Sequence, residues 1–142
     1  MTWTIGVEID PDRTVRAAIL APLTRHNIAA AGETGFETIA ITVRGDDGQI
    51  VGGLWGYTLY RYLFVELLAM GDAKGEGVGR EVMAQAEAEA RRRGCIGMWL
   101  DTFTFQAPDF YAKLGFVEFG RMADYPPGHD RLFLVKRFDP NT

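Results

Sequence analysis

Three glycines stand close together in Lys74-Gly75-Glu76-Gly77-Val78-Gly79, between an apolar run and a helical pattern. Residues 62–70 supply the apolar run, and residues 78–93 supply the amphipathic pattern, which Gly94 ends. Glycine permits backbone angles with φ > 0 and leaves its N–H group uncovered, while the following helix directs its partially positive N-terminus to the same place. The junction therefore predicts a binding site for a phosphate group.

Spacing separates the known kinds of phosphate-binding loop. A P-loop needs a Gly-Lys-Ser/Thr triplet, and none occurs in this chain. A dinucleotide fingerprint needs a third glycine, but Arg80 stands there in one register and Val82 in the other. The order basic residue, glycine, any residue, glycine, aliphatic residue, glycine resembles instead the acetyl-CoA pyrophosphate loop of the GNAT acetyltransferase superfamily. For the loop taken alone, a glycine-rich turn without a ligand is the alternative.

A second segment resembles the same superfamily. Residues 103–116 read FTFQAPDFYAKLGF, a strand end with an amide residue that leads into a short helix of the form Phe/Leu-Tyr-x-x-x-Gly-Phe. The two segments occur in the expected order, one helix and one strand apart, and the resemblance covers most of the chain. It implies an acetyl-CoA-dependent N-acetyltransferase with an α/β (α+β) fold, in which helices flank a mixed, mostly antiparallel central sheet of about seven strands.

Composition limits the remaining classes. At 142 residues, of which 47% are hydrophobic, the chain predicts one domain over residues 1–142. The net charge of −4, without a basic stripe, argues against nucleic acid as a partner. No apolar run approaches the ~20 residues of a membrane span, and no secretion signal precedes the first element, so we expect a cytoplasmic protein without a membrane partner. One cysteine, Cys95, and two histidines, His26 and His129, predict neither a disulfide nor a metal site.

The remaining patterns predict the order of elements. Alternation predicts a first strand from Thr2 to Ile9, and Asp12 is expected to cap a helix from Arg13 to Ala31. The pair Asp47-Gly48 predicts a hairpin. Further expected elements are strands at 36–44, 49–60, 62–70, 96–103, 116–122 and 131–138, and helices at 78–93 and 108–115.

The resemblance also assigns the residues that bind the coenzyme. Main-chain groups at the end of the central strand are expected to pair with the pantetheine arm, and the loop amides with the pyrophosphate. These residues are Leu68, Ala69 and Met70 on the strand, and Lys74, Gly75, Glu76, Gly77, Val78 and Gly79 in the loop. Gln106, the amide residue of the second segment, either holds the arm from the other side or caps the short helix.

Two departures from the family pattern bear on function. Lys74 stands where arginine or glutamine is usual, and the segment from Met70 to Lys74 is one residue shorter than the common spacing. Lysine supplies charge but cannot clamp a phosphate through two parallel hydrogen bonds. The alternative function is therefore a non-catalytic acyl-CoA-binding sensor or interaction domain with the same fold.

Acetyl transfer to an amine requires a neutral amine, for which a base is useful though not obligatory, and a group that stabilises the leaving thiolate. Removing the proton of a lysine-like amine at neutral pH costs about 4 to 5 kcal/mol. Glu66 is the only charge in the apolar strand, and its expected burial makes it the candidate base, directly or through water; pairing with Arg61 is the alternative. Asp101 is the rival base or an anchor for the amine. Tyr111 occupies the position of the family's tyrosine that protonates the coenzyme A sulfur; the alternative is packing beside Phe110.

The acceptor is less well specified by the sequence. Trp55 and Tyr57, with the loop from Asp124 to His129, are candidate substrate-binding residues. A small-molecule amine and a peptide are both compatible acceptors, because such domains share the coenzyme half and vary the rest. The oligomeric state stays open, although homodimers are common among these domains.

Overall fold

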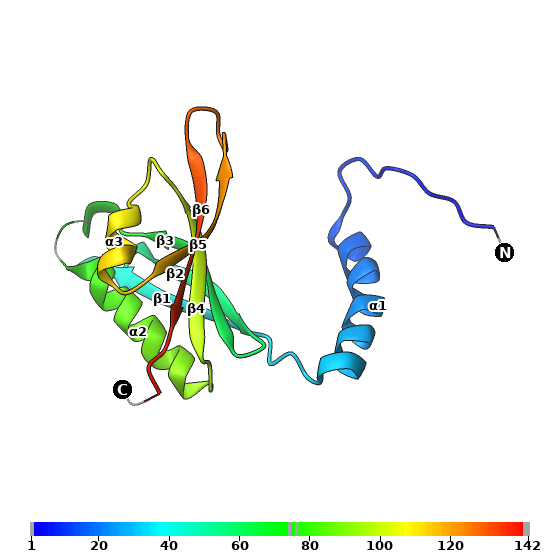
Figure 1. Ribbon diagram of the computed structural model, residues 1–142, viewed down its shortest axis with the longest axis horizontal. Coiled ribbons are helices and arrows are strands. Elements are labelled where there is room, and N and C mark those ends of the chain that lie inside the picture. The colour runs from blue at the N-terminus through cyan, green and yellow to red at the C-terminus, as the bar shows by residue number, and fades with distance from the viewer. Residues whose placement is uncertain (1, 74, 76, 141–142) are drawn as a thin grey trace. The chain divides into compact units, whose positions relative to one another are not determined.

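The computed structural model describes residues 2–73, 75 and 77–140. The chain forms two compact units, Met1–Thr34 and Gly35–Thr142. The first unit holds one helix, and the second holds the sheet and the other helices (Figure 1).

Helix α1 of the first unit, Arg13–Ala31, has the bounds that the sequence predicts. The Asp12 carboxylate accepts a hydrogen bond from the Thr14 amide at 2.9 Å, which satisfies one of the N–H groups left free at a helix start. At the other end Gly32, with φ of 82°, donates its amide to Ile28. Local capping therefore sets both ends of α1.

The strand predicted from Thr2 to Ile9 is wrong. The structure assigns no strand to these residues, and the sheet has six strands rather than about seven. Alternating side chains make a segment compatible with a sheet, but a strand exists only when its N–H and C=O groups pair with a neighbour. The alternation from Trp3 to Ile9 is present in the sequence, but in the described part of the chain these residues pair with no strand.

The second unit is built on one mixed sheet in the order β1-β2-β3-β4-β6-β5. Every neighbouring pair is antiparallel except β3 and β4, which are parallel. The strands are β1 (Glu37–Arg44), β2 (Ile50–Leu59), β3 (Tyr62–Ala69), β4 (Gly97–Phe103), β5 (Val117–Ala123) and β6 (Asp130–Arg137). The helices are η1 (Gly71–Ala73), α2 (Val78–Arg92) and α3 (Pro108–Lys113).

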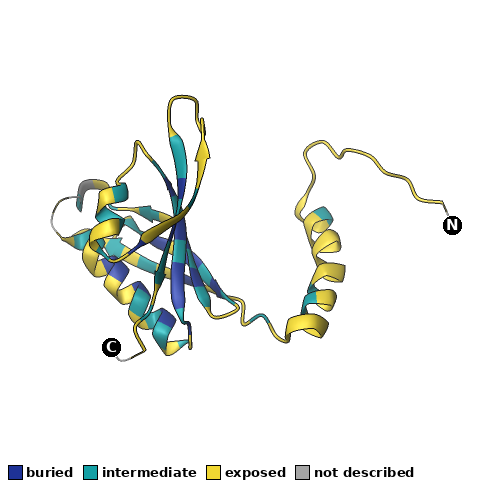
Figure 2. Cartoon of the chain, viewed as in Figure 1, coloured by how far each residue is buried: buried dark blue, intermediate teal, exposed yellow. Residues whose placement is uncertain are grey.

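Helix α2 runs along one face of this sheet and covers the core (Figures 1 and 2). Its buried face consists of Val82, Met83, Ala86 and Ala90. The strands contribute fully buried side chains to the same cluster, the largest of which are Leu63, Met98 and Leu100. Two of these come from β4 and one from β3, so the best-packed part of the core lies under the parallel pair.

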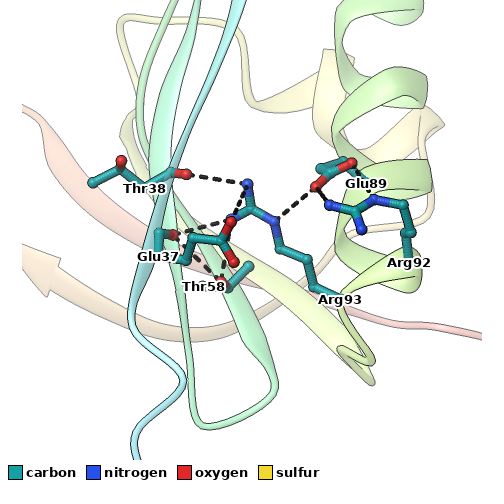
Figure 3. Close-up of polar contacts among 6 residues, drawn as sticks. All are labelled: Glu37, Thr38, Thr58, Glu89, Arg92 and Arg93. Carbon is teal, nitrogen blue, oxygen red and sulfur yellow. Dashed lines mark hydrogen bonds and ion pairs between the residues drawn. The ribbon is translucent and has the colours of Figure 1, made fainter.

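Arg93, directly after α2, ties the helix to the sheet edge (Figure 3). Its guanidinium donates to the main-chain oxygens of Glu37 at 3.0 Å and Thr38 at 3.1 Å, and to the Thr58 hydroxyl at 3.3 Å. The Glu89 carboxylate, one turn back on α2, accepts from Nε at 2.8 Å. The contacts fix the distal end of α2, while its first turn faces the site described next.

Candidate active site

Strands β3 and β4 separate at one end and open a cavity. Their parallel register runs from Tyr62 opposite Gly97 to Val65 opposite Leu100 and goes no further. The ends of both strands, the glycine loop, the loop after β4 and helix α3 surround a cavity of about 970 Å³. Its size is in the range of small-molecule and cofactor sites. The separation leaves the edge of β3 that faces β4 free over its last residues.

A β-bulge places Glu66 at this opening. Val65 pairs with Gly56 and Leu67 pairs with Trp55, so Glu66 is the extra residue. Before the bulge Leu63 and Val65 are buried; after it Leu67 is 61% exposed. The bulge therefore shifts which side chains of β3 face the core.

The expectation that Glu66 is buried is wrong. Its side chain is exposed and lines the cavity. With regular alternation along residues 62–70, the Glu66 side chain would have stayed on the surface of the sheet. The bulge instead turns this side chain outward. The residue stays a candidate base because of its place in the cavity wall, and not because of desolvation.

The glycine loop borders the other end of the cavity. Gly75 and Gly77 have φ of 89° and 74°, a region that side chains disfavour. Space for a ligand is open above both, since a Cβ on either would meet no atom within 4 Å. Gly77 caps α2 without any side-chain hydrogen bond, which leaves the N–H groups of the first turn available. Lys74 and Glu76 lie outside the described residues.

Gly79 is needed for a different reason. A Cβ at this position would stand 3.2 Å from the Phe110 ring of α3. The glycine thus allows α3 to approach the first turn of α2. The Met70 sulfur also lies next to Gly79. Met70 packs against the core and, together with Leu68, lines the cavity.

Gln106 is oriented by the end of β4. Its amide oxygen accepts from the Thr102 hydroxyl at 2.8 Å and from the Phe103 amide at 3.0 Å. Because the Phe103 N–H can only donate, the oxygen of Gln106 must face it, and the NH₂ group is left for the cavity. The alternative role as a cap of the short helix is wrong, since Ala107 is the N-cap of α3 and no side chain caps it.

Tyr111 lines the cavity from α3 and is partly buried. Its ring packs edge-on against Phe110 at 5.2 Å and Phe116 at 5.8 Å between ring centroids. Burial raises the pKa of the Tyr111 phenol above its ordinary value, so it keeps its proton at neutral pH. Phe110, Tyr111 and Leu114 all pack against the core. Core packing and a place in the cavity wall are therefore not exclusive for this tyrosine.

Asp101 also lines the cavity, but it is already paired. Its carboxylate accepts from Arg131 at 2.7 Å through Nη2 and at 3.0 Å through Nε. The Arg131 guanidinium in turn lies 5.1 Å from the Tyr125 ring centroid and donates to the Tyr125 hydroxyl at 3.1 Å. This ion pair engages Asp101 within the protein, so Asp101 is less free than Glu66 to contact an amine.

Trp55 and Tyr57 are not among the residues that line the cavity. Trp55 lies on β2 opposite Leu67 and is 46% exposed. The Tyr57 ring packs between Phe36 and Phe64, with centroid distances of 5.2 and 5.3 Å. The structure thus brings Glu66, Asp101, Gln106 and Tyr111 to one cavity with the glycine loop, and leaves these two aromatic residues on the neighbouring strand.

Sequence reasoning missed several residues of the cavity wall, among them Arg80, Phe105 and Lys113. Arg80 and Lys113 add positive charge beside the glycine loop and on α3, and Phe105 lies in the loop after β4. The one signal for Arg80 was its place directly after Gly79. Elsewhere, the part of the chain that is described holds no group of three His, Cys, Asp or Glu residues suited to a metal ion. None of the described helices combines the length and apolar character that crossing a membrane requires.

Comparison with known proteins identifies this arrangement. The model of the acetyltransferase (GNAT) family matches residues 14–116. This chain belongs to the GNAT acetyltransferase family. An acetyltransferase of Agrobacterium fabrum is 38% identical over 89% of this chain and 93% of its own length. A blasticidin-S acetyltransferase of Streptomyces morookaense is 41% identical over 71% of this chain and 76% of its own length.

Solved structures agree with the GNAT assignment. The crystal structure of an acetyltransferase from Agrobacterium tumefaciens superposes with a TM-score of 0.89 at 35% identity, over 96% of this chain and all of that one. The expected family, the flanked mixed sheet, the N-acetyltransferase class of enzyme and acetyl-CoA as cosubstrate are thereby confirmed. The acceptor and the roles of individual residues stay predictions.

Proposed function

We propose that this GNAT enzyme transfers the acetyl group of acetyl-CoA to a primary amine of a small molecule by direct attack, with residues 1–142 acting as one enzyme. One observation carries the proposal. A single cavity extends from the glycine loop to Glu66 and Tyr111, so the coenzyme's phosphates, its thioester and an amine have room along one path. A site for binding alone would not need a carboxylate and a protonated phenol in the same wall.

The coenzyme half of the cavity suits an extended phosphorylated ligand. The open space above Gly75 and Gly77 and the N–H groups of the first turn of α2 favour a pyrophosphate, and the positive charges of Arg80 and Lys113 attract it further. Next to the loop, β3 continues past Val65 without β4 beside it. Its main-chain groups on that edge from Leu67 to Ala69 can pair with the pantetheine arm in the manner of an added strand.

Glu66 and Tyr111 take opposite roles in the reaction. The neutral amine nitrogen attacks the thioester carbon, so a C–N bond forms and, as the tetrahedral intermediate collapses, the C–S bond breaks. Glu66 accepts the proton of the amine, directly or through a water molecule, and the Tyr111 hydroxyl gives its proton to the departing sulfur. The partial burial of Tyr111 supports the second role, because it keeps the phenol protonated until the sulfur becomes basic.

A small-molecule acceptor is favoured over a peptide. The support is the relative that acts, by its name, on blasticidin-S and is 41% identical to this chain. An antibiotic of this kind or a similar amine is the first acceptor to test. Oligomeric state does not enter the proposal, because every residue used here lies on one chain.

The test uses purified enzyme, acetyl-CoA and a panel of primary amines that includes blasticidin-S, with released thiol as the readout. Calorimetry with coenzyme A alone runs in parallel. Thiol release that depends on an amine supports the proposal. Binding heat without turnover on any amine would favour the non-catalytic acyl-CoA-binding alternative, and absence of heat would contradict both.

A further inference from the structure

The loop between β4 and α3 lines the cavity and is hydrogen-bonded to the residue at which the β5–β6 loop enters β6. The Thr104 amide, just after β4, donates to the Asp130 main-chain oxygen at 2.9 Å, and the Asp130 amide donates to the Thr104 hydroxyl at 3.0 Å. This reciprocal pair joins the loop between β4 and α3 to the start of β6. The side chains carried by the two loops are therefore held in a fixed relation to each other.

The two loops and the end of β4 carry stacked aromatic rings. Phe105 stacks on Phe103 with centroids 5.2 Å apart and planes 10° from parallel, and Tyr125 lies on Phe103 at 5.9 Å and 26°. The His129 ring meets Phe105 edge-on at 5.0 Å. Offset and edge-on arrangements of this kind are the favourable ones for aromatic pairs.

Arg131 contacts the rings of Phe103 and Tyr125 and holds the stack in place. Its guanidinium lies 5.6 Å from the Phe103 ring centroid and 5.1 Å from that of Tyr125, while Asp101 neutralises its charge. Cation–π contacts with a guanidinium held by a carboxylate restrain both rings. The aromatic wall is thus ordered before any ligand arrives, which lowers the entropy cost of binding.

Phe105 is the exposed end of this stack. Its side chain is 54% exposed and lines the cavity, on the same wall as Asp101. An exposed, restrained phenyl ring beside a reaction site favours a flat ligand group, since stacking removes apolar surface from water on both partners. Core packing does not explain Phe105, because it is not part of the buried cluster or of the side chains that pack against it.

We propose that the acceptor amine carries a planar ring that stacks on Phe105 while its amino group reaches toward Glu66. His129 borders the same ring, and the Asp101–Arg131 pair holds the wall in place. This inference rests on the proposed function, because it assigns the acceptor side of that cavity. It narrows the substrate class from primary amines in general to amines that bear an aromatic or heteroaromatic ring.

A matched pair of amines tests the inference. 2-Phenylethylamine and 2-cyclohexylethylamine have the same carbon skeleton and a primary amine on the same ethyl chain, and only one ring is flat. Binding of each to the enzyme saturated with coenzyme A is measured by ligand-observed NMR, which does not require turnover. We expect the aromatic amine to bind about 3- to 10-fold more tightly, as aromatic pair energies predict.

Substitutions locate the preference. Phe105→Leu should remove most of the preference for the aromatic amine, because it should weaken the binding of 2-phenylethylamine alone. Phe105→Tyr should retain the preference. Phe119→Leu is the matched control, because Phe119 is similarly exposed at 58% but does not line the cavity. Kinetic constants for acetyl-CoA are measured for all variants on an amine that the enzyme acetylates.

Each outcome of these measurements supports or overturns the inference. Equal affinities of the two amines, or a preference that survives Phe105→Leu, would overturn the inference. A rise in the KM for acetyl-CoA with Phe105→Leu would also overturn it, because the ring would then contact the coenzyme. Aromatic binding that depends on Phe105 without thiol release from any amine would contradict the proposed function, and with it the acceptor role of the bound amine, while the aromatic binding site at Phe105 itself would remain.

Discussion

Gly56 lies against the main chain of Phe64 across the β2–β3 pair. A Cβ on Gly56 would stand less than 3.0 Å from the Phe64 carbonyl oxygen, a separation that real Cβ atoms do not adopt. Gly56 pairs with Val65 directly beside the bulge that turns Glu66 into the cavity, and Phe64 is the residue before Val65. The absence of a side chain at position 56 is therefore a condition for the shape of the active site.

Gly56→Ala is expected to damage both stability and activity. The added methyl group must push β2 and β3 apart at the bulge, which should lower the free energy of unfolding by about 1–3 kcal/mol. Displacement of Glu66 should lower kcat/KM at least tenfold beyond the loss of folded protein, since misplacements near 1 Å cost about that much or more. Urea unfolding and steady-state kinetics on the same preparation measure the two effects.

Gly120→Ala is the control for this substitution. Gly120 also lies next to a strand irregularity, but a Cβ there would meet only the Phe133 side chain at an ordinary 3.8 Å. We expect a change in unfolding free energy within about 0.5 kcal/mol and normal kinetics. Equal behaviour of the two variants would mean that the close approach at Gly56 has no special role.

Tyr111→Phe should separate chemistry from binding. Removing the hydroxyl leaves the ring contacts with Phe110 and Phe116 in place, so the fold and the affinity for coenzyme A should be retained. If the hydroxyl protonates the sulfur, kcat should fall about 100-fold. Single-turnover kinetics and calorimetry with coenzyme A provide the two measurements. An unchanged kcat would remove Tyr111 from the mechanism.

Local patterns predicted most of the sheet and the helices. The N-cap at Asp12 and the Asp47-Gly48 hairpin give the bounds of α1 and the β1–β2 turn, because both depend on neighbours within a few residues. The strand predicted from Thr2 to Ile9 was wrong for the opposite reason. Its alternation is as clear as that of a strand, but pairing depends on a partner that no local pattern specifies.

The site was predicted less completely than the fold. Residues 62–70 are apolar at both odd and even positions, so a shift in register at Glu66 leaves no trace in the hydrophobic pattern. The ion pair between Asp101 and Arg131 joins residues on β4 and β6, and these strands are neighbours only in the folded sheet. Glycine spacing, in contrast, predicted a turn with φ > 0, which the structure has at Gly75 and Gly77, because this conformation is a local requirement. That the loop binds the coenzyme stays a prediction.

Glu89 should make stability depend on pH in the acid range. Hydrogen bonds from Arg92 and Arg93 lower the pKa of the Glu89 carboxyl to about 2 from its ordinary 4.5. Since the pKa in the folded protein is the lower one, its stabilising contribution is fully present above about pH 5 and is lost as the pH falls toward 2. Glu89→Gln should therefore reduce the loss of stability over this window, as measured by urea unfolding at each pH.

Glu81→Gln is the matched control for Glu89→Gln, on the same helix. The Glu81 carboxylate accepts from the uncharged Gln85 amide at 3.0 Å and not from an arginine. Its replacement should leave the slope of stability against pH as in the parent enzyme. If Glu89→Gln showed the same slope of stability against pH as the parent enzyme, the contacts of Arg93 with the sheet edge would not depend on the Glu89 carboxylate.

Glu66→Gln should lower the rate most at neutral pH. If Glu66 takes the proton of the amine, its loss should reduce kcat/KM about 100-fold at pH 7. The defect should shrink as the pH approaches the pKa of the acceptor, because a growing fraction of the amine is then already neutral and needs no base. The measurement is kcat/KM against pH for parent and variant with a single amine.

Asp101→Asn distinguishes the two carboxylates in the cavity. Because Asp101 is engaged by Arg131, its replacement should remove charge-assisted hydrogen bonds and lower the free energy of unfolding by about 1–3 kcal/mol. If Glu66 and not Asp101 accepts the proton, the shape of the pH profile should not change. A defect that disappears at alkaline pH with Asp101→Asn, and not with Glu66→Gln, would transfer the role of base to Asp101 and require Arg131 to release it during the reaction.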